Sequence, residues 1–187
     1  MDDILVRVQL AIPRIESWMK DLHAKHADQA KPADSLGFAG LARAWPADLL
    51  KEARAVSVDR TPFPPVLDYG LAEFEGMAQG SWAGITFGHM YFTDKTEANE
   101  ATHFHELCHV VQWKVLGVNR FLLTYALGIL ANGYARSPFE AIAYELQEEF
   151  EAGRCRSGLV DVLTTHARNA HAKAAAGLRS DGGERRN

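Results

Sequence analysis

The motif HELCH at residues 105–109 lies in a stretch, residues 94–116, whose apolar residues recur at helical spacing. Two histidines four residues apart on a helix lie one turn above each other, so both imidazoles can face the same ion. Glu106 lies beside them and can accept a proton. Zinc is bound by such histidine pairs in proteins. The stretch therefore predicts a metal-binding helix that ends at Gly117.

This helix is expected to pack through one face and to carry its histidines beside that face. A buried stripe is indicated by the i, i+3, i+4, i+7, i+11 spacing of Phe104, Leu107, Cys108, Val111 and Val115. At ~100° per residue, His105 and His109 lie to one side of the stripe, and His103 lies on the other side, where we expect solvent. The alternative is a pair of histidines that are satisfied by hydrogen bonds at the edge of the core.

A third metal ligand is expected from residues 137–145, in a helix predicted over residues 137–152, because a catalytic zinc site uses three protein ligands and one open position. The same stripe recurs there at Phe139, Ile142, Ala143, Leu146 and Phe150. Glu140 lies ~100° from the start of this stripe, as the first histidine does on its own helix, whereas Glu145 points away. The alternative is a capping box in which Ser137 and Glu140 satisfy backbone N–H groups.

The rest of the chain predicts a single α+β domain, residues 1–187. Residues 1–54 read as an N-terminal helical part, and residues 55–93 as a small, mostly antiparallel sheet region. Residues 94–176 form the helical part with the zinc site, and residues 177–187 are expected to be a disordered tail.

Within these parts, some elements can be placed more closely. A helix at residues 2–28 is expected to be kinked or divided at Pro13, and residues 31–43 read as a connecting loop. A strand is predicted at residues 55–59, and one or two further strands within residues 82–93.

Composition limits the classes of partner. Lys and Arg number 20 against 24 Asp and Glu, which gives a net charge of −4, so we expect no nucleic-acid partner. The uncharged span at residues 121–135 is shorter than the ~20 apolar residues of a membrane helix, and the acidic N-terminus does not resemble a signal peptide. Two cysteines, Cys108 and Cys155, are too few for a disulfide framework. We therefore expect two free thiols and a cytoplasmic protein.

Several segments together resemble a known family, the short bacterial gluzincin-type zinc metallopeptidases sometimes called minigluzincins. The resemblance covers about residues 56–152 and rests on GITFG at 84–88, HELCHVVQ at 105–112, Tyr134, and PFEAIAY at 138–144. The first helices have no counterpart in it.

The resemblance implies a zincin-like fold, a Zn²⁺ cofactor and a peptide or protein substrate. In gluzincins the ligands are the two motif histidines and a glutamate on a later helix, which correspond to His105, His109 and Glu140. The motif glutamate, here Glu106, is the general base. The sequence departs from the larger thermolysin-like members at Tyr144, where they carry an aspartate that can support a ligand histidine.

The sequence thus predicts zinc-dependent hydrolysis of a peptide bond, with a metal-activated water and Glu106 as general base. Tyr134 is a candidate for stabilising the oxyanion, as is Tyr144, although either can also be an ordinary packed aromatic. One alternative is a non-catalytic metal-binding or protein-interaction module of zincin fold. Another is a zinc hydrolase that acts on a different amide or an ester. The sequence indicates no oligomeric state.

Overall fold

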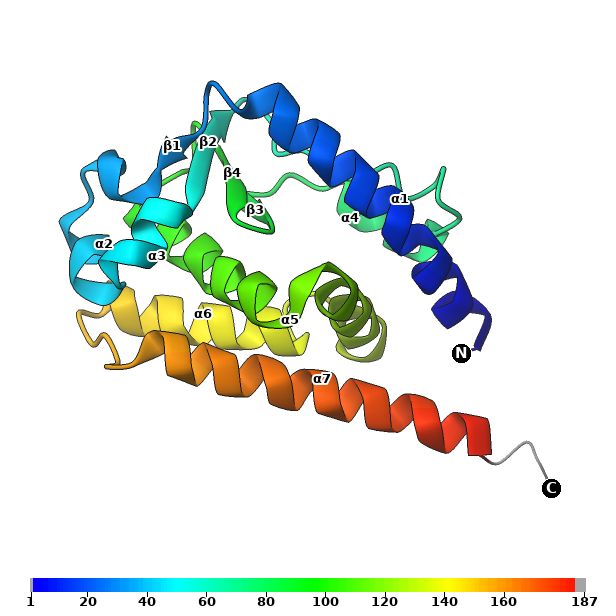
Figure 1. Cartoon of the computed structure of the whole chain (residues 1–187). Helices are drawn as coiled ribbons and strands as arrows, with labels where there is room; N and C mark the ends of the chain where they lie inside the picture. The colour runs from blue at the N-terminus through cyan, green and yellow to red at the C-terminus, as the bar shows by residue number, and fades with distance from the viewer. Residues whose placement is uncertain (1, 184–187) are drawn as a thin grey trace.

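A small sheet and a set of long helices make up the computed structural model, which describes residues 2–183 (Figure 1). The elements, in chain order, are α1 (Asp2–His26), β1 (Lys31–Pro32), η1 (Ala33–Leu36), α2 (Ala39–Ala44), α3 (Ala47–Glu52), β2 (Arg54–Val58), η2 (Ala72–Phe74), α4 (Glu75–Gln79), β3 (Gly84–Phe87), β4 (Met90–Asp94), α5 (Glu100–Asn132), α6 (Pro138–Glu151) and α7 (Leu159–Gly183). The expected α+β class is confirmed.

The sheet has four strands in the order β1-β2-β4-β3 and is mixed. β1 pairs with β2, and β3 with β4, in antiparallel fashion, whereas β2 and β4 run parallel. The parallel pairing arises because β4 returns from its hairpin with β3 in the same direction as β2. Gly88, with a φ of 69°, forms the tight turn of that hairpin. In the strand order given above, β3 lies at one edge of the sheet, among the described strands.

The N-terminal part differs from the sequence expectation at two places. α1 continues through Pro13 as one helix, because its buried face, which includes Val8 and Ile15, packs on the rest of the protein. The expected loop at residues 31–43 instead contains β1, η1 and α2. These elements are too short to produce a periodic pattern, yet Leu41 within them is buried.

α5 is the helix that carries the predicted motif. Asn99 caps its N-terminus: the side chain accepts a hydrogen bond from the backbone N–H of Thr102 in a capping box. Gly117 has a φ of 69° and a ψ of 172°, which are not helical values, so α5 consists of two segments. We call residues 118–132 the second half of α5. The predicted end of the motif helix at Gly117 is confirmed.

The last helices lie beneath α5 in Figure 1, with α6 directly below it and α7 along the bottom. α7 extends to Gly183, beyond the expected end at residue 176, so residues 177–183 are helical rather than a disordered tail. Three of these seven residues are glycines, so the helix continues here against their weak helix propensity. Residues 184–187 of the expected tail lie outside the described residues.

Two properties of the core bear on the expectations above. Cys108 is buried and Cys155 is exposed, and both are free, as predicted.

By length and composition alone, α5 is apolar enough to cross a membrane, since its most apolar window has a mean hydropathy of 1.3. Core helices of globular proteins meet the same criterion, and the bend at Gly117 leaves two segments that are each shorter than ~20 residues. The expectation of no membrane contact stays a prediction.

Candidate metal centre

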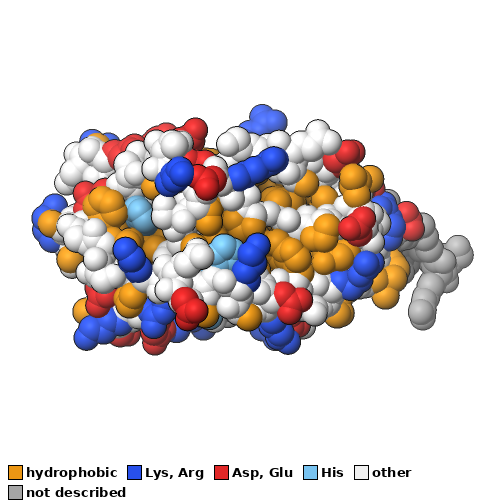
Figure 2. All heavy atoms as spheres, turned by 90° about the horizontal axis from the view of Figure 1, so that it is seen from above, with side chains coloured by type: hydrophobic (Ala, Val, Ile, Leu, Met, Phe, Trp, Pro, Cys, Tyr) orange, Lys and Arg blue, Asp and Glu red, His pale blue; other side chains and the backbone are white. Residues whose placement is uncertain are grey.

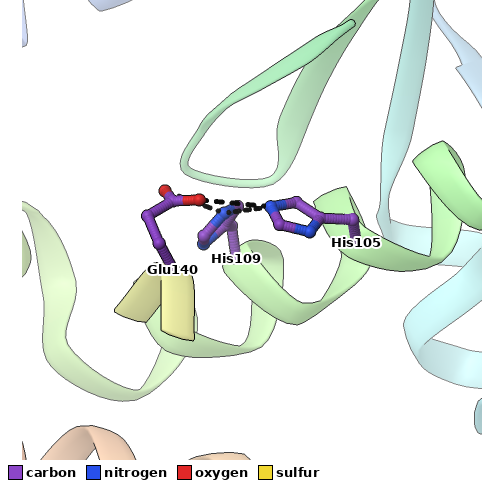
Figure 3. A group of neighbouring side chains, drawn as sticks. All are labelled: His105, His109 and Glu140. Atoms are coloured by element: carbon purple, nitrogen blue, oxygen red, sulfur yellow. Dashed lines mark hydrogen bonds and ion pairs between the residues drawn. The ribbon is translucent and has the colours of Figure 1, made fainter. Parts of the chain in front are cut away.

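His105 and His109 on α5 and Glu140 on α6 meet in the interior, as Figure 3 shows. The Nε2 atoms of the two histidines are 3.1 Å apart. Oε2 of Glu140 lies 3.3 Å from Nε2 of His105, and Oε1 lies 3.3 Å from Nε2 of His109. One ligand atom from each residue lies within 4.8 Å of the others. We call these three residues the His-His-Glu cluster.

Packing of α6 on α5 places Glu140 in this cluster. The apolar stripes of the two helices are buried, with Phe104 and Phe139 almost completely inaccessible. Glu140 is buried to the same degree, at 1% exposure. Within the described structure, the N-cap residue Ser137 makes no side-chain capping hydrogen bond. The capping-box alternative for Glu140 is therefore wrong, because its carboxylate faces the histidines instead of the helix end.

Each histidine of the cluster has a glutamine at its Nδ1 atom, the ring nitrogen that faces away from the centre. Nδ1 of His109 lies 2.8 Å from Oε1 of Gln112, and Nδ1 of His105 lies 3.0 Å from Oε1 of Gln147. The Gln112 amide nitrogen donates to the backbone oxygen of Phe139, which fixes the oxygen end of that amide toward His109. An amide oxygen can only accept, so Nδ1 of His109 carries a proton and neutral His109 presents a lone pair at Nε2.

The lone pair at Nε2 of His109 and the carboxylate oxygens of Glu140 therefore point toward the centre of the cluster. They repel one another unless a cation lies between them. Among the described groups, Oε2 of Glu140 has no hydrogen-bond partner although it is buried. Burial alone would raise the pKa of Glu140, but the two histidines lower it. Burial would likewise lower the pKa of His109, but Glu140 and Glu106 raise it to about 9. A positive charge at this point, a proton or a metal ion, is thus favoured.

Glu106 lies next to the cluster and is held from β3. It is 3% exposed, and the Thr86 hydroxyl donates to its Oε2 at 2.6 Å. A side chain at Gly84 would collide with the carboxylate, because a Cβ there would lie 2.4 Å from Oε1. Burial raises the pKa of Glu106, while His109 and His105 act in the opposite direction. The structure thus places a buried carboxylate with restricted motion beside two candidate ligands.

The two tyrosines that the sequence proposed for the oxyanion, Tyr134 and Tyr144, differ in burial: Tyr134 is partly buried and Tyr144 is exposed. Tyr134 lines a cavity together with Glu106 and His109, and its ring lies 4.6 Å from that of Trp82. Burial raises the pKa of its hydroxyl. Tyr144 is 39% exposed and its ring lies 4.6 Å from that of His105. Whether either tyrosine acts on an oxyanion stays a prediction.

Tyr125 is a site residue that the sequence reasoning missed. Its hydroxyl donates to Oε1 of Glu140 at 2.7 Å. No local spacing relates Tyr125 to Glu140, because the bend at Gly117 decides where the second half of α5 lies. Gln112 could have been found, since it is three residues after His109 on the same helix.

His103 is a correction to the sequence analysis. We expected it to be solvated, but it is 6% exposed, and its Nδ1 lies 3.1 Å from the Tyr91 hydroxyl. The ring of Phe38, just before α2, covers it, and the centroids of the two rings are 5.0 Å apart. The face of α5 opposite the cluster is therefore also covered, and burial lowers the pKa of His103 to about 4.

The donors of the cluster suit a metal ion. Two imidazole nitrogens and one carboxylate oxygen are donors that transition-metal ions bind in proteins. Comparison with known proteins adds no family: no family model, curated protein or solved structure is significantly similar to the chain.

Proposed function

We propose that this chain is a zinc-dependent peptidase of the gluzincin type, with His105, His109 and Glu140 as the metal ligands. The observation that carries the proposal is the position of Glu106, a buried carboxylate directly beside the cluster that, among the described residues, forms no ion pair and caps no helix. Nitrogen and carboxylate ligands in a set of three are typical of catalytic zinc.

The metal would supply Lewis acidity, which polarises a carbonyl oxygen and makes a water more acidic. Glu106 would accept the proton of that water at a carboxylate oxygen and later deliver it to the leaving amine. The Thr86 hydroxyl orients the carboxylate for this step, since it already donates to Oε2 at 2.6 Å. We assign Tyr134 as a hydrogen-bond donor to the developing oxyanion, because its burial keeps the hydroxyl protonated.

A peptide substrate is favoured over other amides by the position of β3. This strand lies at the sheet edge and contains both Gly84 and Thr86, which contact Glu106. An edge strand presents unpaired backbone N–H and C=O groups, with which an extended peptide can pair. A peptide bound in this way would run past the general base.

Metal analysis and peptide cleavage together test the proposal. Purified protein should contain about one zinc per chain and should cleave members of a broad peptide library. Glu106→Gln should keep the metal and lose ~10²-fold or more in kcat/KM. Glu148→Gln, an exposed glutamate on α6, is the matched control and should behave as the wild type.

The same measurements distinguish the non-catalytic alternative. If the wild type binds zinc but cleaves no peptide, and Glu106→Gln changes nothing, the cluster belongs to a metal-binding or interaction module. If neither protein holds a metal, the assignment of the three ligands is wrong.

A further inference from the structure

A cavity of about 120 Å³ adjoins the His-His-Glu cluster on the side of α1. Glu106 and His109 lie at one end of it. Its other walls include the buried face of α1, strand β3, the second half of α5, and the segment between β2 and α4 (residues 59–74), which we call the crossing. The cavity therefore connects the proposed reaction centre with the N-terminal helix, which lies outside the part of the sequence that resembles a known family.

The lining is apolar apart from the end at the cluster. Ile12 and Ile15 face the cavity from α1, and Phe121 and Ala126 face it from α5. Their side chains leave no polar partner for water in this region, and water enters a cavity only where polar groups can bind it. A dry cavity of roughly 150 Å³ with such a lining binds benzene in another protein, so this one can accept a group of similar size.

α1 is held in place as a wall of the cavity by polar contacts at its exposed side. Arg7 forms an ion pair with Glu73 at 2.5 Å, and Arg14 donates to the backbone oxygen of Asp68. The segment between these two partners contains Leu71, which also lines the cavity. The contacts thus tie α1 to the crossing, and both walls are fixed relative to each other.

The surface on the α1 side is apolar as well. Val6 and Leu10 on α1 are 50% and 71% exposed. Figure 2, which views the molecule from above, shows hydrophobic side chains gathered along one half of this face.

We propose that this cavity is a specificity pocket that binds one apolar group of the size of a leucine or phenylalanine side chain, with α1 as one wall. The proposal rests on the proposed function in that the group would belong to the substrate bound at the cluster. The size of the cavity limits the group, and its apolar lining excludes charged and amide side chains, whose desolvation would not be compensated.

Binding of toluene tests the pocket without any need for catalysis. Trp82 and Trp113 line the cavity, so occupancy can be followed by their fluorescence. Toluene should bind the wild type saturably, and Ala126→Leu, which fills the cavity, should weaken binding at least 10-fold. Ala131→Leu is the matched control on the same helix, where the residue is exposed, and it should bind toluene as the wild type does.

A second pair of variants tests the contribution of α1. Ile15→Ala should enlarge the pocket and tighten binding of the larger probe naphthalene at least 5-fold, whereas Leu10→Ala at an exposed position should not. This pair gives an answer even if Ala126→Leu fails to fold. Equal affinities across both pairs, or no saturable binding of either probe, would overturn the proposal.

Peptide cleavage then identifies the source of the group. Peptides with one Leu or Phe near the cleaved bond should lose at least 10-fold in kcat/KM with Ala126→Leu relative to otherwise identical peptides with Ala. If toluene binding follows the pattern above but no peptide is cleaved, the pocket stands and the proposed peptidase function fails. If peptides are cleaved with no preference for apolar residues and toluene does not bind, the function stands and the pocket proposal fails.

Discussion

The hydroxyl of Tyr125 donates a hydrogen bond of 2.7 Å to Oε1 of Glu140 and so links the second half of α5 to the first turn of α6. Oε1 also lies 3.3 Å from Nε2 of His109, while Oε2 has no hydrogen-bond partner among the described groups. The bond therefore fixes the plane of the carboxylate and leaves one oxygen free for a metal ion. Such partners of a ligand usually tune metal affinity.

Tyr125→Phe should lower zinc affinity roughly 10- to 100-fold, because the carboxylate loses the donor that orients it. The ring is kept, so the packing of the second half of α5 should change little. Competition with a chromophoric chelator measures the effect. Tyr69→Phe is the control: it removes the hydroxyl of a tyrosine whose ring contacts Arg14 of α1 and not the cluster, so it should leave the zinc affinity unchanged. Equal affinities of all three proteins would show that the bond does not position Glu140.

Glu140→Ala should weaken zinc binding by orders of magnitude, since two histidines alone lack both the third donor and its negative charge. Glu145→Ala is the control on the same helix, where Glu145 pairs with Arg156 at the surface. It should retain the metal. Elemental analysis after dialysis against a weak chelator distinguishes the two. Zinc that survives Glu140→Ala but is lost in Glu145→Ala would refute the ligand assignment.

The sequence predicted the parts of the fold that have long, regular patterns. The stripes that include Phe104 and Phe139 identify the two helices of the site, and Gly117 marks the end of the first. The short elements between residues 31 and 44 were missed because each spans too few residues to show a period, and they are stabilised by contacts with β2 and the core. The parallel pairing of β2 with β4 depends on the path of a long crossing, which no local pattern specifies.

The cluster itself could be predicted, but its surroundings only in part. Glu140 and His105 each lie ~100° around their helix from the first residue of its apolar stripe, so they come opposite each other when the two stripes pack together. The structure brings both side chains together. Tyr125 could not be inferred in this way, because the backbone angles at Gly117 set the direction of the segment that carries it. His103 was misplaced because the residues that cover it come from distant parts of the chain.

Gly84→Ala should reduce hydrolysis while leaving the metal in place. A Cβ at this position would lie 2.4 Å from Oε1 of Glu106 and 2.7 Å from its Cδ, so the carboxylate would have to move. Displacement of a catalytic group by about 1 Å can lower the rate by ~10²-fold. Gly76→Ala in α4, where a Cβ meets nothing within 4 Å, is the control. The prediction fails if Gly84→Ala cleaves peptides at the wild-type rate.

His103 should make the folded state less stable in mild acid. Burial lowers its pKa from 6.5 to about 4. Between these pH values the unfolded chain binds a proton that the folded chain does not, so the contribution is fully present above pH 6.5 and is lost as the pH falls toward 4. At ~1.4 kcal/mol per pH unit, the loss at pH 5 amounts to about 2 kcal/mol.

His103→Gln removes this titration and keeps a polar group that can bond to the Tyr91 hydroxyl. Urea unfolding at pH 7.5 and pH 5.0 gives the acid sensitivity of each protein. His23 and His166, whose pKa values burial also lowers, contribute equally to the wild type and the variant, so the difference between the two proteins isolates His103. We expect the variant to lose about 2 kcal/mol less than the wild type between the two pH values. An equal loss would mean that His103 is protonated in the folded protein at pH 5, which its enclosure by Tyr91 and Phe38 argues against.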